Sequence, residues 1–176
     1  MRFHAAAISA ALVVTLAAGV DARERNIDAP HLRSLDQAAG ELLVTAQQKS
    51  ATVRDLVAKL ENSNLVAYIH VAPGANGTLG SGLSFVGAST KQRFVLISIA
   101  SGASADRQIE LLGHELQHAS EVASASWVAS DAQFQSLLAM VGWRDGTRAR
   151  GYETMAANQA ERQVRRELQA VGGTRQ

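Results

Sequence analysis

The apolar residues of this chain change their spacing along the sequence. From residue 35 to residue 60 they recur every three or four positions, which predicts two amphipathic helices. The first helix has two possible starts, Asp28 followed by Pro30 or the capping-box sequence at residues 34–37, and the second starts at Ser50 or Thr52. The inward-facing stripes are Leu35, Ala38, Ala39, Leu42, Leu43 and Ala46 in the first helix and Val53, Leu56, Val57 and Leu60 in the second.

Three short apolar runs follow, at Leu65–Val71, Leu83–Gly87 and Arg93–Ile99, and they predict three strands. The glycine-rich segment Pro73–Gly82 joins the first two runs. It lacks the spacing and the lysine of a phosphate-binding loop, so we interpret it as a connection. Because short turns join antiparallel neighbours, we expect a three-stranded, mostly antiparallel sheet.

Helical spacing returns in the second half of the chain. One helix begins at residues 104–106 and runs to about Ala125, and another begins at Ser130. A last helix opens at Tyr152 or Glu153 and continues to about Ala170. The expected fold class is α+β, with N-terminal helices, a sheet and C-terminal helices in a single domain of residues 30–176.

Residues 1–22 have the three parts of a secretory signal peptide. The opening Met1–His4 is mildly basic, Ala5–Gly19 is apolar, and Val20-Asp21-Ala22 offers small residues at the cleavage positions. The apolar run of about 15 residues is shorter than the about 20 of a membrane-spanning helix, which makes an uncleaved anchor the weaker alternative. We therefore expect a secreted or periplasmic protein.

Composition and charge argue against several modifications and partners. The chain contains no cysteine, so the expected exported protein has no disulfide and no thiol for a lipid anchor. Residues 23–29 form a polar linker, and no dense basic run occurs before the last helix. With a formal net charge of +1, nothing predicts a nucleic-acid partner or a stable membrane anchor after signal cleavage.

The strongest motif is His114-Glu115-Leu116-Gln117-His118, which reads H-E-x-x-H inside a helical pattern. Residues four apart share one face of a helix, so His114 and His118 can point two imidazoles at one metal ion. Glu115 flanks the same face and can take a proton from a metal-bound water. These residue types at this spacing predict a zinc site with Glu115 as the catalytic base.

The alternative is an ordinary amphipathic helix that carries two surface histidines. A buried stripe beside the motif favours the metal site. That stripe consists of Ile109, Leu112, Leu116, Ala119 and Ala123. Gly113 is small at a position where the helix must approach a neighbour, which also favours a buried motif.

Three carboxylates are candidates for a third metal ligand. Glu121 lies about 10 Å along the helix axis from His114 at roughly 1.5 Å per residue, so we interpret it as an outer-shell partner of a histidine. Glu161 stands among arginines and has the pattern of a solvated ion-pair partner. Glu153 stands among small residues at the expected start of the last helix, which makes it the favoured ligand.

The chain resembles the gluzincin zinc metallopeptidases at residues 114–119, preceded by the expected strand at residues 93–99. It also looks like uncharacterised bacterial proteins with an H-E-L-Q-H-A-x-E-V signature, here at residues 114–122, and a later Y-E-T-x-A-A segment, here at residues 152–157. The resemblance implies zinc, His114 and His118 as ligands, Glu115 as general base, and hydrolysis of peptide bonds in a peptide or protein substrate. It also implies a substrate strand along a sheet edge, for which we expect Arg93–Ile99 to line the cleft.

Two departures from the family pattern bear on turnover. Ala157 occupies the position where such peptidases often have an aspartate, and the candidates to stabilise the transition state are Tyr152, Tyr68 and His70. His70 is also a weak candidate for a further metal-site histidine. The alternatives to an exported zinc peptidase are a metal-binding zincin-like domain with little or no turnover and a helical binding module without metal.

Overall fold

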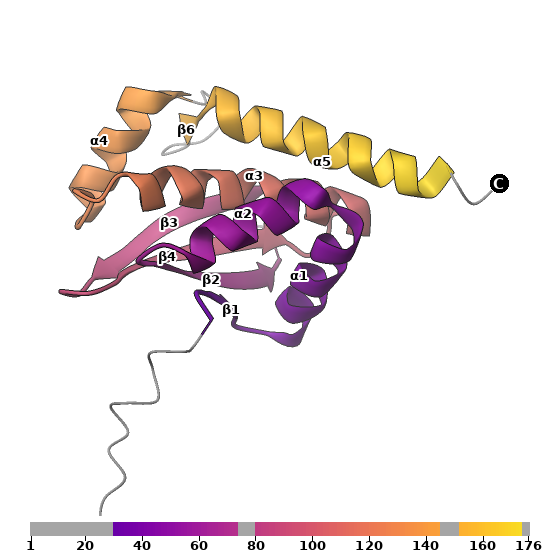
Figure 1. The fold of residues 1–176 in the computed structure, drawn as a ribbon, viewed down its shortest axis with the longest axis horizontal. Helices are drawn as coiled ribbons and strands as arrows, with labels where there is room; N and C mark the ends of the chain where they lie inside the picture. The colour runs from indigo at the N-terminus through magenta and orange to yellow at the C-terminus, as the bar shows by residue number, and fades with distance from the viewer. Residues whose placement is uncertain (1–29, 74–79, 145–151, 174–176) are drawn as a thin grey trace, which may run out of the picture.

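The computed structural model describes residues 30–73, 80–144 and 152–173, and the expected α+β class is confirmed (Figure 1). The expected signal peptide and linker, most of the glycine-rich segment, and residues 145–151 lie outside the described residues. The helices are α1 (Gln37–Lys49), α2 (Ala51–Glu61), α3 (Ala105–Ser124), α4 (Asp131–Val141) and α5 (Met155–Gly173). The strands are β1 (Leu32–Ser34), β2 (Leu65–Ala72), β3 (Ser81–Ala88), β4 (Arg93–Ala100), β5 (Trp143–Arg144) and β6 (Tyr152–Glu153).

The main sheet has four strands in the order β1-β2-β4-β3. Only β3 and β4 are antiparallel, whereas β1 is parallel to β2 and β2 is parallel to β4. The expectation of three mostly antiparallel strands was therefore wrong in two respects. The strand at residues 32–34 is too short to show a hydrophobic periodicity, so it was not predicted. The strand β3 follows β2 in the sequence but pairs with β4, on the side of β4 away from β2, and no local pattern indicates this.

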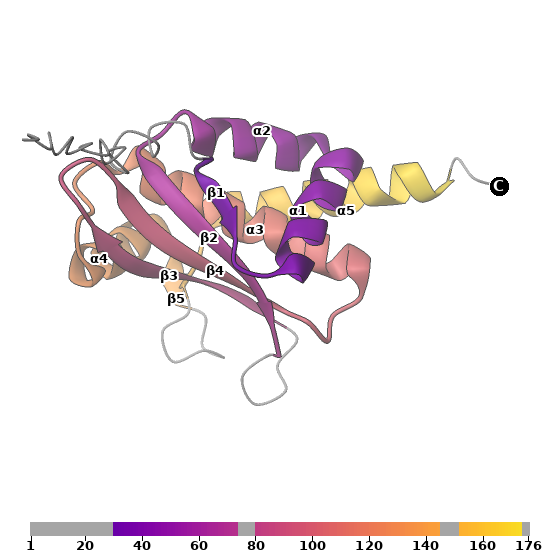
Figure 2. The ribbon, with the colours of Figure 1, turned by 90° about the horizontal axis from the view of Figure 1, so that it is seen from below.

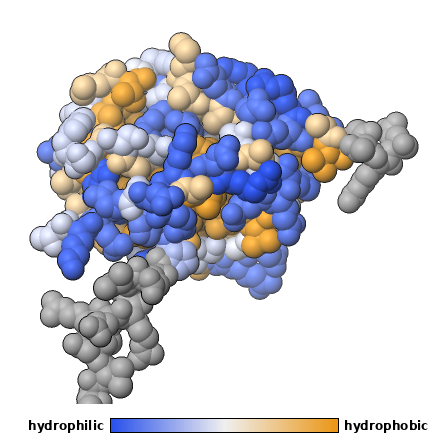
Figure 3. All heavy atoms as spheres, viewed as in Figure 1, coloured by the Kyte–Doolittle hydropathy of each residue, from blue (hydrophilic) through white to orange (hydrophobic). Residues whose placement is uncertain are grey.

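Helices cover one face of this sheet in two layers. In Figure 2 the strands cross in front of α3, while α1 and α2 lie beside them on the side of β1, and Figure 1 places α5 on the far side of α3. Alternate residues of β4 point into the core, because Val95, Ile97 and Ile99 are fully buried while the residues between them are partly exposed. The surface in Figure 3 is mainly hydrophilic, with hydrophobic side chains in small groups.

The central helix α3 is fixed at both ends and along its length. The Ser104 side chain accepts a hydrogen bond from the backbone N–H of Arg107 at the N-cap. At the other end, the buried Arg93 guanidinium donates to the carbonyls of Val122, Ala123 and Ala125, which satisfies acceptors that the helix leaves open. The strand β4 thus determines where the helix ends, and with it the position of the histidines.

The close approach expected at Gly113 is present. A Cβ at this position would lie 2.7 Å from Cγ2 of Val164 on α5, nearer than a carbon atom is tolerated. Glycine therefore permits the separation at which α5 packs on α3.

Two helix starts differ from the sequence expectation. The helix α1 is capped by Asp36, whose carboxylate accepts from the N–H groups of Ala39 and Val71 at 2.8 and 3.0 Å, so neither Asp28 nor Ser34 starts it. The last helix begins at Met155, because Thr154 Oγ1 accepts from the Ala157 N–H. Among the described residues, no helix is long and apolar enough to cross a membrane.

Candidate metal centre and active site

The two histidines of the motif lie side by side on one buried face of α3. His114 and His118 are 6% and 4% exposed, and their Nε2 atoms are 3.1 Å apart. The rings meet edge to face with centroids 4.8 Å apart. This arrangement follows from the spacing of four residues, and it excludes the alternative of two surface histidines.

Glu153 completes the set from β6, far along the chain from α3. Its Oε2 lies 3.3 Å from His114 Nε2, and its side chain is 20% exposed. The expected placement in the first helical turn was wrong, since Thr154 caps α5 and Glu153 precedes that cap in an extended segment. Pairing of Glu153 with Trp143 of β5 holds this segment in place instead.

Gly142 allows β6 to approach the end of α4. A Cβ at Gly142 would lie 2.2 Å from the carbonyl oxygen of Glu153, a distance that no side chain can occupy. The glycine and the short β5–β6 pair therefore bring the Glu153 backbone to the place from which its carboxylate reaches the histidines. The sequence analysis did not assign Gly142 this role.

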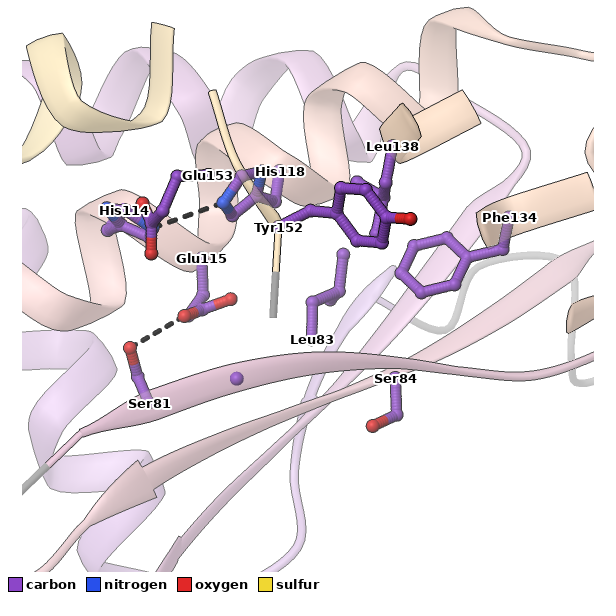
Figure 4. A pocket seen from close by; sticks show the side chains of 11 residues that line it. Ser81, Leu83, Ser84, His114, Glu115, His118, Phe134, Leu138, Tyr152 and Glu153 are labelled. Atoms are coloured by element: carbon purple, nitrogen blue, oxygen red, sulfur yellow. Dashed lines mark hydrogen bonds and ion pairs between the residues drawn. The ribbon is translucent and has the colours of Figure 1, made fainter. Parts of the chain in front are cut away.

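The three side chains form a donor set that could hold a metal ion. One nitrogen from each histidine and one oxygen of Glu153 all lie within 4.8 Å of one another (Figure 4). The Nε2 atoms of the histidines are 3.1 Å apart and Glu153 Oε2 is 3.3 Å from His114 Nε2, and one ion can bridge such pairs because two zinc–ligand bonds of about 2.0–2.2 Å span up to about 4.4 Å. The residues therefore fit a metal ion, in the combination that the sequence analysis favoured.

Each histidine is held from behind by a carboxylate at Nδ1, which leaves Nε2 to face the centre of the site. Glu121 Oε2 lies 3.0 Å from His118 Nδ1, and Glu161 Oε2 lies 3.2 Å from His114 Nδ1. Thr154 donates to the other oxygen of Glu121 at 2.7 Å. Outer-shell carboxylates of this kind fix the tautomer and orientation of ligand histidines.

These positions decide between the roles that the sequence left open. Glu121 has the outer-shell position that was expected for it, whereas Glu161 was expected to be mainly solvated and is instead built into the site. Its exposed fraction is 16%, and its Oε1 also accepts hydrogen bonds from Arg107 and Arg165. Both arginines bind Glu110 as well, so a partly buried charge network connects α3 with α5 behind the histidine.

The network determines the charge of Glu161. The hydrogen bond with His114 is the main cause that lowers its pKa to about 2; burial opposes it, and Arg107 reinforces it. Burial alone would lower the pKa of His114. Hydrogen bonds with Glu153 and Glu161 and the charge of Glu115 outweigh burial and raise that pKa to about 10 in the metal-free protein. The site is thus preorganised to hold positive charge between its carboxylates.

Glu115 lies beside the donor set without belonging to it. It is only 2% exposed, and Ser81 of β3 donates a hydrogen bond of 2.6 Å to its Oε1 (Figure 4). The sequence analysis missed Ser81, because no local signal relates residue 81 to residue 115. The serine fixes one carboxylate oxygen and directs the other toward the pocket.

A pocket of about 260 Å³ opens in front of these groups. Its lining includes Ser81–Ser84 of β3 together with His114, Glu115, His118, Phe134, Leu138, Tyr152 and Glu153 (Figure 4). A second cavity of about 370 Å³ adjoins the site on its other side, where Arg107, Asn158 and Glu161 contribute polar groups. Substrate atoms could therefore reach the candidate metal centre from two chemically different sides.

The remaining predicted residues take other places. His70 lies on β2, where it pairs with Asp36 at 2.8 Å, and it is not among the residues that line either cavity. Tyr152 lines the pocket, and its ring lies beside Leu138 in Figure 4 with the hydroxyl pointing away from Glu115 and the histidines. Ala157 is fully buried in the first turn of α5, and its side chain has no polar atom to offer a histidine.

The strand expected along the cleft was the wrong one. Arg93–Ile99 belongs to β4, which is hydrogen-bonded to β2 on one side and β3 on the other. The edge strand that passes the site is β3. Because β2 pairs directly with β4, the strand β3, which lies between them in the sequence, takes the edge of the sheet.

Comparison with known proteins adds no relative to this picture. No family model matches the chain, and no match to it was found among the curated proteins or the solved structures. The function must therefore be argued from the geometry of this site.

Proposed function

We propose that this protein is an exported zinc-dependent metallopeptidase. The observation that carries the proposal is the convergence of His114, His118 and Glu153 beside the buried carboxylate of Glu115. Two histidines and one glutamate are a recurrent ligand set of catalytic zinc, and such sites keep a position for water or substrate. The adjoining pocket supplies room for that position.

Zinc bound by this set would lower the pKa of a water molecule and polarise a peptide carbonyl. Glu115 then acts as general base. Its Oε1 is occupied by Ser81, which leaves Oε2 to accept a proton from the attacking water. Oxygen bonds to the carbonyl carbon, the C–N bond breaks, and Glu115 delivers the proton to the departing amine.

The residues behind the ligands support this chemistry by limiting movement. Glu121 and Glu161 hold the two imidazoles through Nδ1, so Nε2 of each histidine would be the atom available to bind the metal. A purely structural site has no use for a buried base in front of the ligands. The position of Glu115 therefore favours the peptidase over a metal-binding domain without turnover.

Export is the part of the proposal that rests on sequence alone. The basic start, apolar run and small residues at the cleavage positions of residues 1–22 support a cleavable signal peptide. N-terminal sequencing of extracytoplasmic protein should place the mature start near Arg23, and recovery of Met1 in the cytosol would contradict export.

The decisive experiment measures metal content and peptide hydrolysis on the same preparations. We expect about one zinc per chain in the parent protein and in Glu115→Gln, with cleavage of an unfolded protein by the parent only. Glu41→Gln is the matched control, because Glu41 lies on α1 and bonds Gln37 away from the site. Zinc in both proteins without cleavage by either would instead support the metal-binding domain without turnover.

A further inference from the structure

We propose that this site selects a bulky apolar side chain on the substrate residue whose carbonyl is attacked. The apolar part of the pocket in front of the site holds this side chain, and it is formed by Leu83, Phe134, Leu138 and Tyr152. The inference rests on the proposed function and deepens it, because it names the class of peptide bond that is cleaved.

The walls of the pocket are apolar and prearranged. Phe134 and Leu138 of α4 belong to the core and are 2% and 6% exposed, and Leu83 and Tyr152 pack against them while partly exposed. The Phe134 ring stacks on Phe85 of β3 with centroids 6.2 Å apart, which anchors α4 to the edge strand. Apolar pockets with rigid walls favour ligands that remove apolar surface from water.

The other side of the site has a different character. Its cavity is lined by Arg107, Asn158 and Glu161 with one apolar residue, Leu111, and it shares Ser81, His114 and Glu153 with the whole pocket in front of the site. A substrate that crosses the candidate metal centre therefore meets apolar groups on one side and charged or polar groups on the other. Selection for an apolar side chain belongs to the first side only.

The edge strand β3 indicates whether the apolar pocket holds the residue on the N-terminal or the C-terminal side of the cleaved peptide bond. The Ala100 N–H donates to the carbonyl of Gly80, and the antiparallel ladder alternates from there. The backbone groups of Leu83 consequently point toward the open edge, where, among the described strands, none pairs with β3. An extended peptide can add there as a further strand of the sheet. Antiparallel pairing is slightly more stable than parallel pairing, so we expect the peptide to run antiparallel to β3.

Antiparallel addition fixes the direction of the substrate. Ser81 bonds the base Glu115, and Leu83 lies two residues further along β3 beside the apolar pocket. A peptide that runs antiparallel to β3 passes Leu83 before it reaches Ser81. The side chain in the apolar pocket therefore belongs to the N-terminal side of the scissile bond.

The test uses hydroxamates, because a hydroxamate chelates the metal and fixes which side of the site a peptide occupies. N-acetyl-leucine hydroxamate places its side chain on the N-terminal side, and the alanine compound is its control. A malonyl hydroxamate coupled to leucine amide or alanine amide places the side chain on the C-terminal side. Binding to the zinc-loaded protein is measured by calorimetry.

We expect the first leucine compound to bind about 10- to 100-fold more tightly than its alanine control, from the burial of one large apolar side chain. The C-terminal pair should differ by less than about threefold, since that cavity is polar. Equal affinities in the first pair, or a larger preference in the second, would overturn the inference. Absence of binding by all four compounds would overturn it together with the metal site.

A pair of variants locates the pocket. Leu83→Phe fills the pocket and should remove the preference for leucine over alanine, whereas Val86→Phe adds the same kind of group on the exposed outer part of β3 and should keep it. If both variants keep the preference, the pocket has been misassigned. Failure of the parent to cleave peptides would refute the hydrolytic function, while these affinities still decide the pocket.

Discussion

Replacing Glu153 by glutamine tests whether the ligand set is the one that the geometry indicates. The substitution keeps the shape of the side chain but removes the anionic oxygen 3.3 Å from His114 Nε2. Loss of an outer-shell partner typically weakens metal binding 10- to 100-fold, so loss of a direct ligand should cost at least about 100-fold, or about 2.8 kcal/mol. Competition with a chelator at neutral pH measures this affinity.

Two further variants calibrate the result. Glu121→Gln should weaken zinc binding only about 10-fold, because the amide oxygen can still accept from His118 Nδ1. Asp106→Asn, on the exposed start of α3 beside Lys49, removes the same charge away from the site and should change affinity less than about threefold. If Glu121→Gln loses zinc and Glu153→Gln keeps it, the assigned ligand is wrong.

Three other predictions follow from close contacts and charge. Gly113→Ala should lower the free energy of unfolding, measured with urea, by about 1–3 kcal/mol through its clash with Val164. The double variant with Val164→Ala should recover part of this stability. Equal losses with and without the second change would refute the contact. Gly142→Ala should displace the Glu153 backbone and weaken zinc binding at least about 10-fold in the same chelator assay, and unchanged affinity would contradict the role of the glycine. Because the pKa of His114 is raised to about 10, zinc must displace a proton from this histidine at lower pH, so the apparent zinc affinity should rise about tenfold per pH unit up to that value. A zinc affinity that does not depend on pH would refute the raised pKa. The raised pKa also stabilises the metal-free protein below pH 6.5, and this contribution to the free energy of unfolding should disappear between pH 6.5 and about 10.

Local patterns in the sequence predicted the helices, the strands β2, β3 and β4, and half of the site. The side chains of Ser50, Ser104 and Ser130 cap α2, α3 and α4 as expected, because an N-cap depends on residues within one helical turn. The pairing of His114 with His118 depends only on the pitch of a helix. Chemical reasoning also identified Glu153, although it assigned that residue to the wrong element.

Only the tertiary structure decided what depends on distant parts of the chain. Whether a strand pairs in parallel depends on the route of the connection, so the sequence misjudged the edge strand and missed β1. The hydrogen bond from Ser81 to Glu115 and the approach of Glu161 to His114 join segments that no local period relates. Local hydrogen bonds and helical pitch thus placed His114, Glu115 and His118 together on α3. The packing of β3, β6 and α5 around that helix brought Ser81, Glu153 and Glu161 to them and formed the pocket.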